Sequence, residues 1–377
     1  MTLTWLQRSK LVWLWGFRPA DIPAYGFDGR RPSSDAGRYL GSDWNRRFVQ
    51  DVVNDPRNHV LTEHKWVFYR FAHGFGLSVP PTIGFFDSIQ GVSWDGLRPM
   101  RTVPQVLAEL DRERPSGLVV KPAGGGQGAQ IVILDRIDHA TGTATTRTGE
   151  ETSLEQVLAA LDPGGERGVS GYVLQHAVRN HPELEPLAPT TTNTCRVLTT
   201  VAEDGTAHVH AASIRLGRRG GMIDNWGSGG VSIPIDVTTG VMGPGILKGV
   251  PGDLTDHPDT GERFAGRQLP LWQETTELCR RAAVLFPGLR FLGWDVVIGP
   301  DGPVLLEGNV HWSLRGSQML ADEGWLADPD TRERLEGLGV PLPTGRLSRQ
   351  VAVGVLVRGQ DRARRVVRRT GRALTSR

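Results

Sequence analysis

The sequence predicts a mixed α+β fold built from antiparallel hairpins and separate helices. Strand-like segments follow one another directly within 196–217 and within 290–309, each pair joined by a turn. Helical patterns are found at 103–115, 151–163 and 269–287. Strand and helix do not alternate regularly, so a parallel sheet of repeated βαβ units is not expected. The 377 residues are enough for two or three subdomains with real cores.

The remaining elements are helices and short strands, apart from one irregular segment. Residues 1–60 mix aromatic and charged side chains and are predicted to be helical, and the apolar residues of 64–77 lie on one side of a helix that glycine ends. Four β-rich segments are expected strands: 79–86, 117–122, 130–135 and 171–178. The glycine-rich segment 217–250 is expected to be irregular.

The bulk composition excludes several classes of protein. A net charge of +2 argues against a surface that binds a polyanion, so nucleic acid is not an expected partner. Cys195 and Cys279 are too few and too far apart for a disulfide framework or a zinc site, which fits a reducing compartment. The apolar run at 10–17 is far shorter than the ~20 residues that span a bilayer, and no signal-peptide cleavage site follows it. We therefore place the protein in the cytoplasm.

Residues 118–135, LVVKPAGGGQGAQIVILD, form a glycine loop between two β-rich segments. The lysine precedes the glycines and no Gly-Lys-Ser/Thr occurs, which excludes a Walker loop. A strand follows the loop where a Rossmann site has a helix. Backbone amides of glycines can converge on an anion without side chains in the way. We therefore expect a phosphate-binding flap between two antiparallel strands, with Lys121 supplying a point charge.

A second polar cluster lies on the last predicted hairpin. Glu307 and Asn309 share one face of a strand because they are two residues apart, and Asp295 lies on the other strand. A plain turn at 299–302 pairs Asp295 with Leu306 and places it on the opposite face from the other two, whereas a β-bulge would bring the carboxylates together. Carboxylate and amide oxygens suit Mg²⁺. Both carboxylates lie in apolar segments, where an unpaired charge is costly.

A lysine–glycine flap followed along the chain by a hairpin with two carboxylates and an asparagine resembles the ATP-grasp superfamily. This superfamily includes D-alanine–D-alanine ligase, glutathione synthetase and the ribosomal-protein glutamate ligase. Over about residues 40–320 the chain is most similar to the sugar-transfer-associated ATP-grasp family. The matching segments are HKWVFY, VVKPAGGGQG, LQHAVRNHPEL, TTNTCRVLTT, IRLGRRGGMIDNWGSGG, HPDTG and GWDVVIGPDGPVLLEGN. The resemblance implies an ATP-grasp fold with a nucleotide between two α+β subdomains. The expected regions are a helical N-terminal region (1–95), a flap subdomain (96–178), a metal subdomain (179–330) and a basic tail (331–377).

The resemblance also implies roles for individual residues in nucleotide binding. Lys121 corresponds to the lysine that contacts phosphate, and Lys65 to an earlier nucleotide lysine. The flap corresponds to Gly124, Gly125, Gly126, Gln127 and Gly128. At the hinge that reads adenine, glutamine replaces the acid that is frequent in the family. The residues expected at the adenosine are Gln175, His176, Val178 and Glu183.

The remaining implied residues hold metal and the reacting groups. The ligands of Mg²⁺, with Mn²⁺ as an alternative ion, correspond to Asp295, Glu307 and Asn309. The order of two strand arginines and an asparagine before glycines is similar to the glutamate-adding ligases, so the catalytic set is Arg196, Arg215 and Asn225. For each arginine a surface ion pair is the alternative interpretation. Lys248, in a glycine-rich loop, faces either the acceptor site or solvent.

The function implied is that of an ATP-dependent carboxylate–amine ligase that forms an acyl phosphate, in polysaccharide, cell-envelope or secondary-metabolite biosynthesis. Two alternatives stay open: a phosphotransferase that acts on a hydroxyl group, and a nucleotide-binding partner protein without turnover. The expected cofactors are ATP and Mg²⁺, and the expected partners are small-molecule substrates, with no transmembrane segment. The tail 346–377 holds ten arginines and one acid, so it is either a solvated basic helix or a contact for a membrane surface or an acidic partner.

Overall fold

The computed structural model describes residues 3–125, 130–161, 171–218, 224, 229–248 and 250–346. They form two compact units, one made of both chain ends (up to residue 53 and from 313) and one made of 54–312. This is a different division from the regions expected to end at residues 95, 178 and 330, which stay predictions. Among the described residues, no helix combines the length and the apolar character that a membrane span requires.

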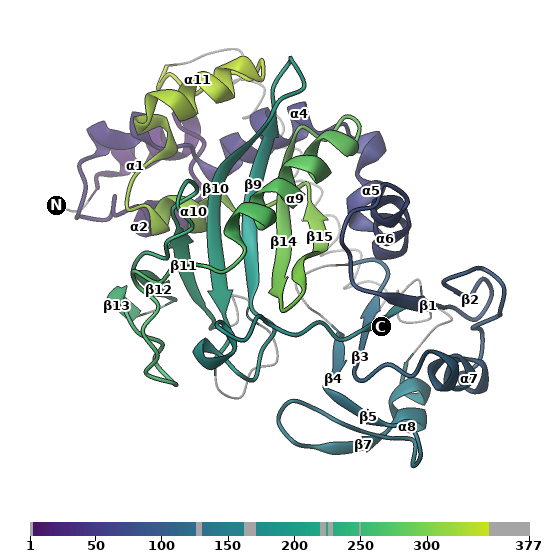
Figure 1. Cartoon of the computed structure of the whole chain (residues 1–377). Helices are drawn as coiled ribbons and strands as arrows, with labels where there is room; N and C mark the ends of the chain where they lie inside the picture. Colours follow the sequence, from purple (N-terminus) through teal and green to yellow (C-terminus); the bar gives the residue numbers. More distant parts are fainter. Residues whose placement is uncertain are drawn as a thin grey trace, which may run out of the picture. The chain divides into compact units, whose positions relative to one another are not determined.

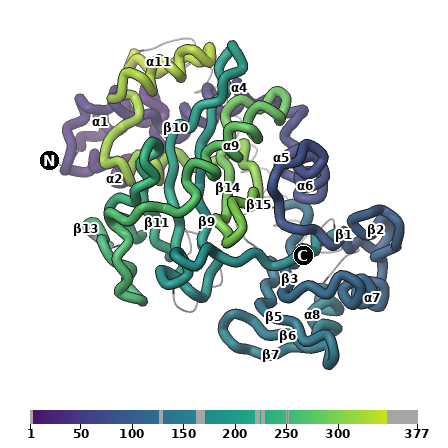
Figure 2. The backbone as a smooth tube through the Cα atoms, viewed as in Figure 1, coloured from purple at the N-terminus to yellow at the C-terminus, as the bar shows by residue number. Residues whose placement is uncertain are grey.

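The unit formed by the chain ends is helical. Its elements are α1 (Trp5–Leu14), α2 (Asp21–Ala24), η1 (Ser33–Arg38), α3 (Ser42–Trp44), η2 (Asn45–Gln50), α4 (Asp51–Val53), α10 (Leu314–Leu320), η6 (Trp325–Ala327) and α11 (Pro329–Gly337). Figures 1 and 2 show the purple start and the yellow end of the chain side by side in this unit. Asp21, which is fully buried, joins them by accepting a hydrogen bond from Arg315 Nε at 2.9 Å.

A seven-stranded antiparallel sheet is the centre of the second unit. Its strands are β9 (Thr194–Val201), β10 (Ala207–Leu216), β11 (Val231–Ile235), β12 (Gly245–Leu247), β13 (Val250–Leu254), β14 (Phe291–Gly299) and β15 (Gly302–Asn309). Their order is β13-β12-β11-β10-β9-β14-β15. Helix α9 (Trp272–Leu285) packs on β9, β10 and β14 (Figure 1). Every residue of β14 is buried, because both faces of this strand are covered.

A five-stranded antiparallel sheet carries the glycine flap. Its strands are β1 (Thr82–Phe86), β2 (Val92–Ser93), β3 (Leu118–Pro122), β4 (Val132–Leu134) and β8 (Tyr172–His176), in the order β2-β1-β8-β3-β4. Helix α7 (Val103–Glu113) packs against β1. Since β3 and β4 pair antiparallel, with Val120 opposite Val132, the flap joins neighbouring strands as the sequence predicts.

In the second unit, three helical segments precede β1 and another lies between β8 and β9. They are η3 (Pro56–Asn58), α5 (Val60–Glu63), α6 (Lys65–Gly74) and η4 (Glu185–Leu187). Helix α6 buries Phe68, Tyr69 and Ala72. The ring of Phe68 stacks on Phe286, just after α9, with centroids 5.8 Å apart. An amphipathic helix is therefore present within 64–77, as expected. Its buried face differs from the predicted one, because Phe68 is buried but Phe75, which was expected on the same side, follows the end of α6 and is 51% exposed.

Two details of the expected secondary structure are wrong. The segment 217–250 was expected to be irregular, but it supplies β11 and β12, because its buried side chains Val231, Ile233 and Ile235 alternate at strand spacing despite the glycines. The helix expected at 151–163 begins only at Leu154, as α8 (Leu154–Ala159). Residues before it form β7 (Glu151–Ser153), which pairs with β6 (Thr143–Thr145) and, beyond it, β5 (Arg136–Asp138) in a third sheet.

The α+β class with antiparallel sheets is confirmed. The chain order of the elements places the polar hairpin β14–β15 in the seven-stranded sheet and the glycine flap in the five-stranded one. Helix α6 contacts β15, the second strand of this hairpin. The candidate site is built from these three parts.

Candidate functional site

A β-bulge brings the two hairpin carboxylates together. From the turn, the β14–β15 pairs run in regular register as far as Val296 opposite Leu305, and the next pair is Asp295 opposite Glu307. Leu306 is therefore the extra residue, and the bulge that the sequence required for a shared carboxylate face is present. Burial, and then the charge of Asp295, raise the pKa of Glu307.

Two arginines on neighbouring strands bind the same carboxylate. Arg196 on β9 lies directly opposite Asp295 in the sheet. Its Nε donates to Asp295 Oδ1 and its Nη2 to Oδ2 at 3.0 Å, and Arg215 Nη2 on β10 also reaches Oδ2 at 3.0 Å. Burial alone would raise the pKa of Asp295, but the two guanidinium groups outweigh it and hold the pKa well below its ordinary value. Neither arginine forms the surface ion pair that was the alternative.

A second buried carboxyl group orients Arg215 through a threonine. Arg215 Nε donates to Thr194 Oγ1 at 3.1 Å, and the Thr194 amide donates to Asp224 Oδ2 at 2.7 Å. Thr194 Oγ1 also donates to this oxygen, and Arg215 Nε lies 3.8 Å from it. Burial raises the pKa of Asp224, and Arg215 opposes the shift. Sequence reasoning missed both Thr194 and Asp224. They lie in the motifs TTNTCR and MIDNW, but no spacing to another charged residue marks either of them in the sequence.

Lys121 is connected to the carboxylate strand by a tyrosine. Lys121 Nζ donates to Tyr69 Oη at 2.7 Å, and Tyr69 Oη donates to the carbonyl of Leu306 at 2.6 Å. Tyr69 thus joins β3, which carries the lysine, to the bulge of β15. Sequence reasoning missed Tyr69, although it follows Lys65 by four residues and so shares a face of α6 with it.

Lys65 lies at the entrance to the glycine flap. Its Nζ donates to the carbonyl of Gly125 at 2.9 Å, and its amide donates to the carbonyl of Ala123 at 2.7 Å. Gly125 has a φ of +87°, a conformation that residues with a side chain rarely adopt. Gly124 is half-buried and Gly125 is exposed. The structure therefore brings Lys65, Lys121 and the start of the flap together.

Both lysines are buried, which makes their protonation sensitive to a bound anion. Burial lowers the pKa of Lys121 to about 7, with Glu307 acting in the opposite direction and Lys65 in the same direction. Burial likewise lowers the pKa of Lys65, again opposed by Glu307. Three carboxyl groups thus face four basic side chains: Asp224, Asp295 and Glu307 against Lys65, Lys121, Arg196 and Arg215. An arrangement of this kind favours a polyanion accompanied by a cation.

The donor chemistry of the hairpin fits a magnesium ion. Asp295, Glu307 and Asn309 offer only carboxylate and amide oxygens, which are the ligands that Mg²⁺ prefers. Asn309 Nδ2 donates to Glu307 Oε1 and to the carbonyl of Gly293, each at 3.3 Å, so its amide oxygen is the atom left to act as a ligand.

The expected hinge lies at the end of β8. Gln175 is buried and its Nε2 donates to Thr82 Oγ1 at 2.9 Å. The amide of His176 donates to the carbonyl of Pro81 at 2.9 Å, so a base would be read by other backbone groups of this segment. The carbonyl of Val178 accepts from Arg147 Nη2 at 3.4 Å.

Other expected site residues are exposed or lie outside the described part of the chain. Glu183 is exposed, beyond the hinge, and Lys248 is exposed after β12. Four expected residues lie outside the described residues: Gly126, Gln127, Gly128 and Asn225. The basic tail does so as well from residue 347 onward.

Comparisons with known proteins identify one family. A family model described as sugar-transfer associated ATP-grasp matches residues 43–336. A search of curated proteins finds no match.

Solved structures with some similarity share little sequence with the chain. N5-carboxyaminoimidazole synthase from Aspergillus clavatus is 10% identical, with 77% of this chain and 54% of that chain covered and a TM-score of 0.41. Biotin carboxylase from Campylobacter jejuni is 10% identical, with 80% and 52% covered and a TM-score of 0.47. Phosphoribosylamine–glycine ligase from Thermotoga maritima is 13% identical, with 79% and 60% covered and a TM-score of 0.46. The chain spans about half the length of the first structures it matches.

Proposed function

The chain belongs to the sugar-transfer associated ATP-grasp family, and from this premise we propose that it is an ATP-dependent carboxylate–amine ligase acting through an acyl phosphate. The observation that carries the proposal is the contact between two sheets at one point. Lys121, from the flap sheet, binds through Tyr69 to the carbonyl of Leu306, at the bulge that sets Asp295 opposite Glu307. The groups proposed to bind phosphate and metal are thereby joined by two hydrogen bonds.

Lys121 and Lys65 would contact the phosphates of ATP. Both are buried and held by hydrogen bonds, so little side-chain freedom is lost when an anion binds. The expected flap would close over the phosphates and exclude the water that hydrolyses acyl phosphates. The residues proposed for the adenosine are those of the β8 end: Gln175, His176, Val178 and Glu183.

Asp295, Glu307 and Asn309 would hold Mg²⁺, or Mn²⁺ in its place. A bound ion at these oxygens would neutralise charge on the β- and γ-phosphates. Asp295 already orients Arg196 and Arg215 by accepting from both guanidinium groups. The same carboxylate would therefore also determine where the two arginine side chains lie when a γ-phosphate is bound.

The proposed reaction has two steps. An oxygen of the substrate carboxylate attacks the γ-phosphorus, the bond to the β-phosphate oxygen breaks, and ADP and an acyl phosphate form. Arg196 and Arg215, with Asn225, would stabilise the negative charge that spreads over the transferring oxygens. An amine then attacks the acyl carbon, phosphate leaves and the amine nitrogen loses a proton, which gives an amide. Positioning and charge neutralisation supply the catalysis, and no covalent enzyme intermediate is required.

The test is a screen for ADP release with Mg-ATP, in which carboxylates and amines are supplied singly and in pairs. A ligase requires both acceptors and yields an amide. Release with one hydroxyl acceptor and a stable phosphorylated product would replace the ligase with a phosphotransferase. ATP binding without release in any combination would leave a nucleotide-binding partner protein.

Two variants and a control connect the screen to the site. Lys121→Ala and Glu307→Ala should each abolish ADP release while the protein stays folded. Circular dichroism and the thermal unfolding midpoint measured without ATP check that each variant is folded. Lys10→Ala, which removes an exposed lysine of α1, should behave as the wild type. Full turnover in either site variant would show that the nucleotide is bound elsewhere.

A further inference from the structure

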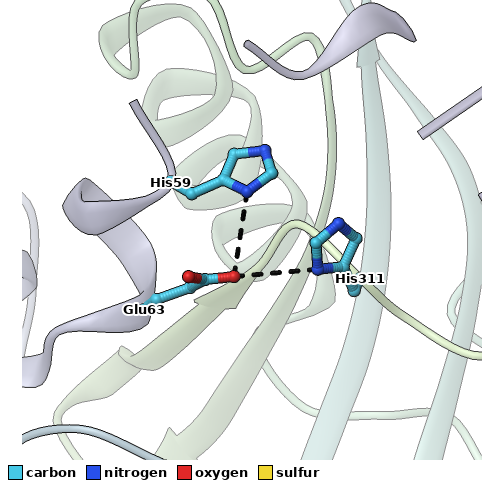
Figure 3. Close-up of side chains that lie close together, drawn as sticks. All are labelled: His59, Glu63 and His311. Atoms are coloured by element: carbon cyan, nitrogen blue, oxygen red, sulfur yellow. Dashed lines mark ion pairs between the residues drawn. The ribbon is translucent and has the colours of Figure 1, made fainter. Parts of the chain in front are cut away.

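Three side chains from two separate segments converge near the end of β15. Figure 3 shows His59 and His311 on two sides of the Glu63 carboxylate. His59 Nδ1 lies 3.8 Å and His311 Nδ1 lies 3.7 Å from Glu63 Oε1. One ligand atom from each residue can be chosen so that all three lie within 4.8 Å of one another. These contacts involve no residue proposed for ATP or Mg²⁺.

Helix α5 and the end of β15 position these side chains. His59 precedes α5, and the amide of Glu63 donates to the carbonyl of His59 at 2.9 Å, so one helical turn sets both side chains on the same face. His311 follows β15 by two residues. Helix α5 approaches this strand closely, because a Cβ added to Gly308 would lie only 3.0 Å from Thr62 Cγ2.

The buried residue Asn54 holds both segments. Its carbonyl oxygen lies 3.2 Å from His59 Nε2, and its side-chain Nδ2 donates to the carbonyl of Val310 at 3.3 Å. A carbonyl oxygen can only accept, so Nε2 of His59 carries the hydrogen and Nδ1 of the neutral ring directs its lone pair at the cluster. A backbone carbonyl is one of the usual partners of the outer nitrogen of a metal-binding histidine.

We propose that His59, Glu63 and His311 bind a zinc ion. The nitrogen–oxygen distances of 3.7 and 3.8 Å are too long for hydrogen bonds. They are close to the separation of two zinc ligands, since atoms about 2.1 Å from the ion at a tetrahedral angle lie about 3.4 Å apart. Two imidazoles and a carboxylate suit zinc rather than Mg²⁺, which prefers oxygen alone. Three protein ligands leave a fourth position for water or another group.

The zinc ion would join two segments that lead into the proposed nucleotide site. Glu63 precedes Lys65 by two residues, and His311 follows Asn309 by two. An ion bound to both segments would hold the start of α6 against the end of β15. Zinc binding goes beyond the proposed ligase function and does not depend on it, so the two can fail separately.

The experiment is a Co²⁺ titration of the full chain after removal of metals with a chelator, without nucleotide. Co²⁺ replaces Zn²⁺ and absorbs visible light strongly when it has four or five ligands, but weakly in an octahedral oxygen site. The wild type should bind one Co²⁺ with strong absorption, and added Zn²⁺ should displace it. His311→Ala and Glu63→Gln should each weaken Co²⁺ affinity at least about tenfold, since loss of even an outer-shell partner has an effect of this size.

Two controls separate this site from other possibilities. His139→Ala removes a half-buried histidine whose Nε2 also contacts a backbone carbonyl, that of Pro115 at 2.9 Å, and should leave the titration unchanged. Glu307→Gln should also leave it unchanged. Absence of the strong absorption in wild type would overturn the proposal, as would its persistence in folded Glu63→Gln and His311→Ala. Its loss in Glu307→Gln would assign the ion to the proposed Mg²⁺ site instead.

Discussion

Replacing Tyr69 with phenylalanine removes one oxygen atom that joins the two parts of the proposed nucleotide site. Tyr69 is fully buried, and its hydroxyl accepts from Lys121 Nζ at 2.7 Å and donates to the Leu306 carbonyl at 2.6 Å. The ring itself keeps its packing in Tyr69→Phe. The variant therefore tests the two hydrogen bonds alone.

The expected loss follows from what each partner is left with. Loss of the buried acceptor of Lys121 should lower the free energy of unfolding by about 1–2 kcal/mol. Loss of the donor to the Leu306 carbonyl should lower it by a further ~1–2 kcal/mol. We expect Tyr69→Phe to lower the free energy of unfolding by about 2–4 kcal/mol. The KM for ATP should rise about tenfold, equivalent to about 1.4 kcal/mol, because Lys121 is no longer held at the bulge.

Urea unfolding measures the first effect and ADP release at varied ATP concentration the second. Tyr39→Phe, a buried tyrosine of the other unit, is the matched control and should leave the ATP dependence unchanged. If Tyr69→Phe had wild-type stability and wild-type KM, the hydroxyl would not connect the two sheets as the distances indicate. A loss of stability with unchanged KM would separate the fold from the phosphate contact.

Two further predictions concern Lys121 and a close backbone contact. Burial lowers the pKa of Lys121 to about 7, so the side chain is mostly neutral at about pH 8. Binding of the ATP phosphates should raise this pKa, so the protein should take up close to one proton when ATP binds. Calorimetry in buffers of different ionisation enthalpy measures this uptake, which should be absent in Lys121→Met. Gly308→Ala should lower the free energy of unfolding by about 1–3 kcal/mol, because the added Cβ would lie 3.0 Å from Thr62 and 3.0 Å from Trp294. Gly316→Ala, where the added Cβ meets nothing within 4 Å, is the control for urea unfolding, and equal losses in the two variants would contradict the steric reason.

The flap and the acidic hairpin could be predicted because each is encoded in a short stretch of sequence. The order of Lys121 and the glycines, followed by a strand, is local information, and so is the i, i+2 spacing of Glu307 and Asn309. The family resemblance drawn from these motifs is confirmed over most of the chain. The register of Asp295 was beyond the sequence, because a bulge at Leu306 depends on how both strands pack in the sheet.

The contacts between elements were also beyond the sequence. In the sequence, Tyr69 is one of several aromatic residues in a predicted helix. Its role is visible only when the helix is packed, because its hydroxyl then contacts Lys121 on β3 and the carbonyl of Leu306 on β15. Arg196 and Arg215 were predicted as phosphoryl-binding residues, but their common partner Asp295 is visible only when three strands are adjacent. Strands β11 and β12 were missed because glycines and turns interrupt their alternation.

The two hairpin carboxylates should respond in opposite ways to loss of charge. Asp295→Asn leaves Arg196 and Arg215 facing a neutral amide in a largely buried place, which should lower the free energy of unfolding by about 3–5 kcal/mol. Burial and the neighbouring Asp295 raise the pKa of Glu307, so its charge is unfavourable in the folded state. Glu307→Gln should therefore be as stable as the wild type or more stable.

The raised pKa of Glu307 also determines how stability should change with pH. A raised pKa means that the folded protein holds the Glu307 proton more tightly, so wild-type stability relative to Glu307→Gln should fall as the pH rises above the ordinary value of 4.5. Urea unfolding at several pH values measures this difference. ADP release should fall strongly in both variants, because each replaces a charged ligand proposed for Mg²⁺ with a neutral amide. Equal stability losses in Asp295→Asn and Glu307→Gln would mean that the guanidinium groups of Arg196 and Arg215 are shared between the carboxylates and not held by Asp295.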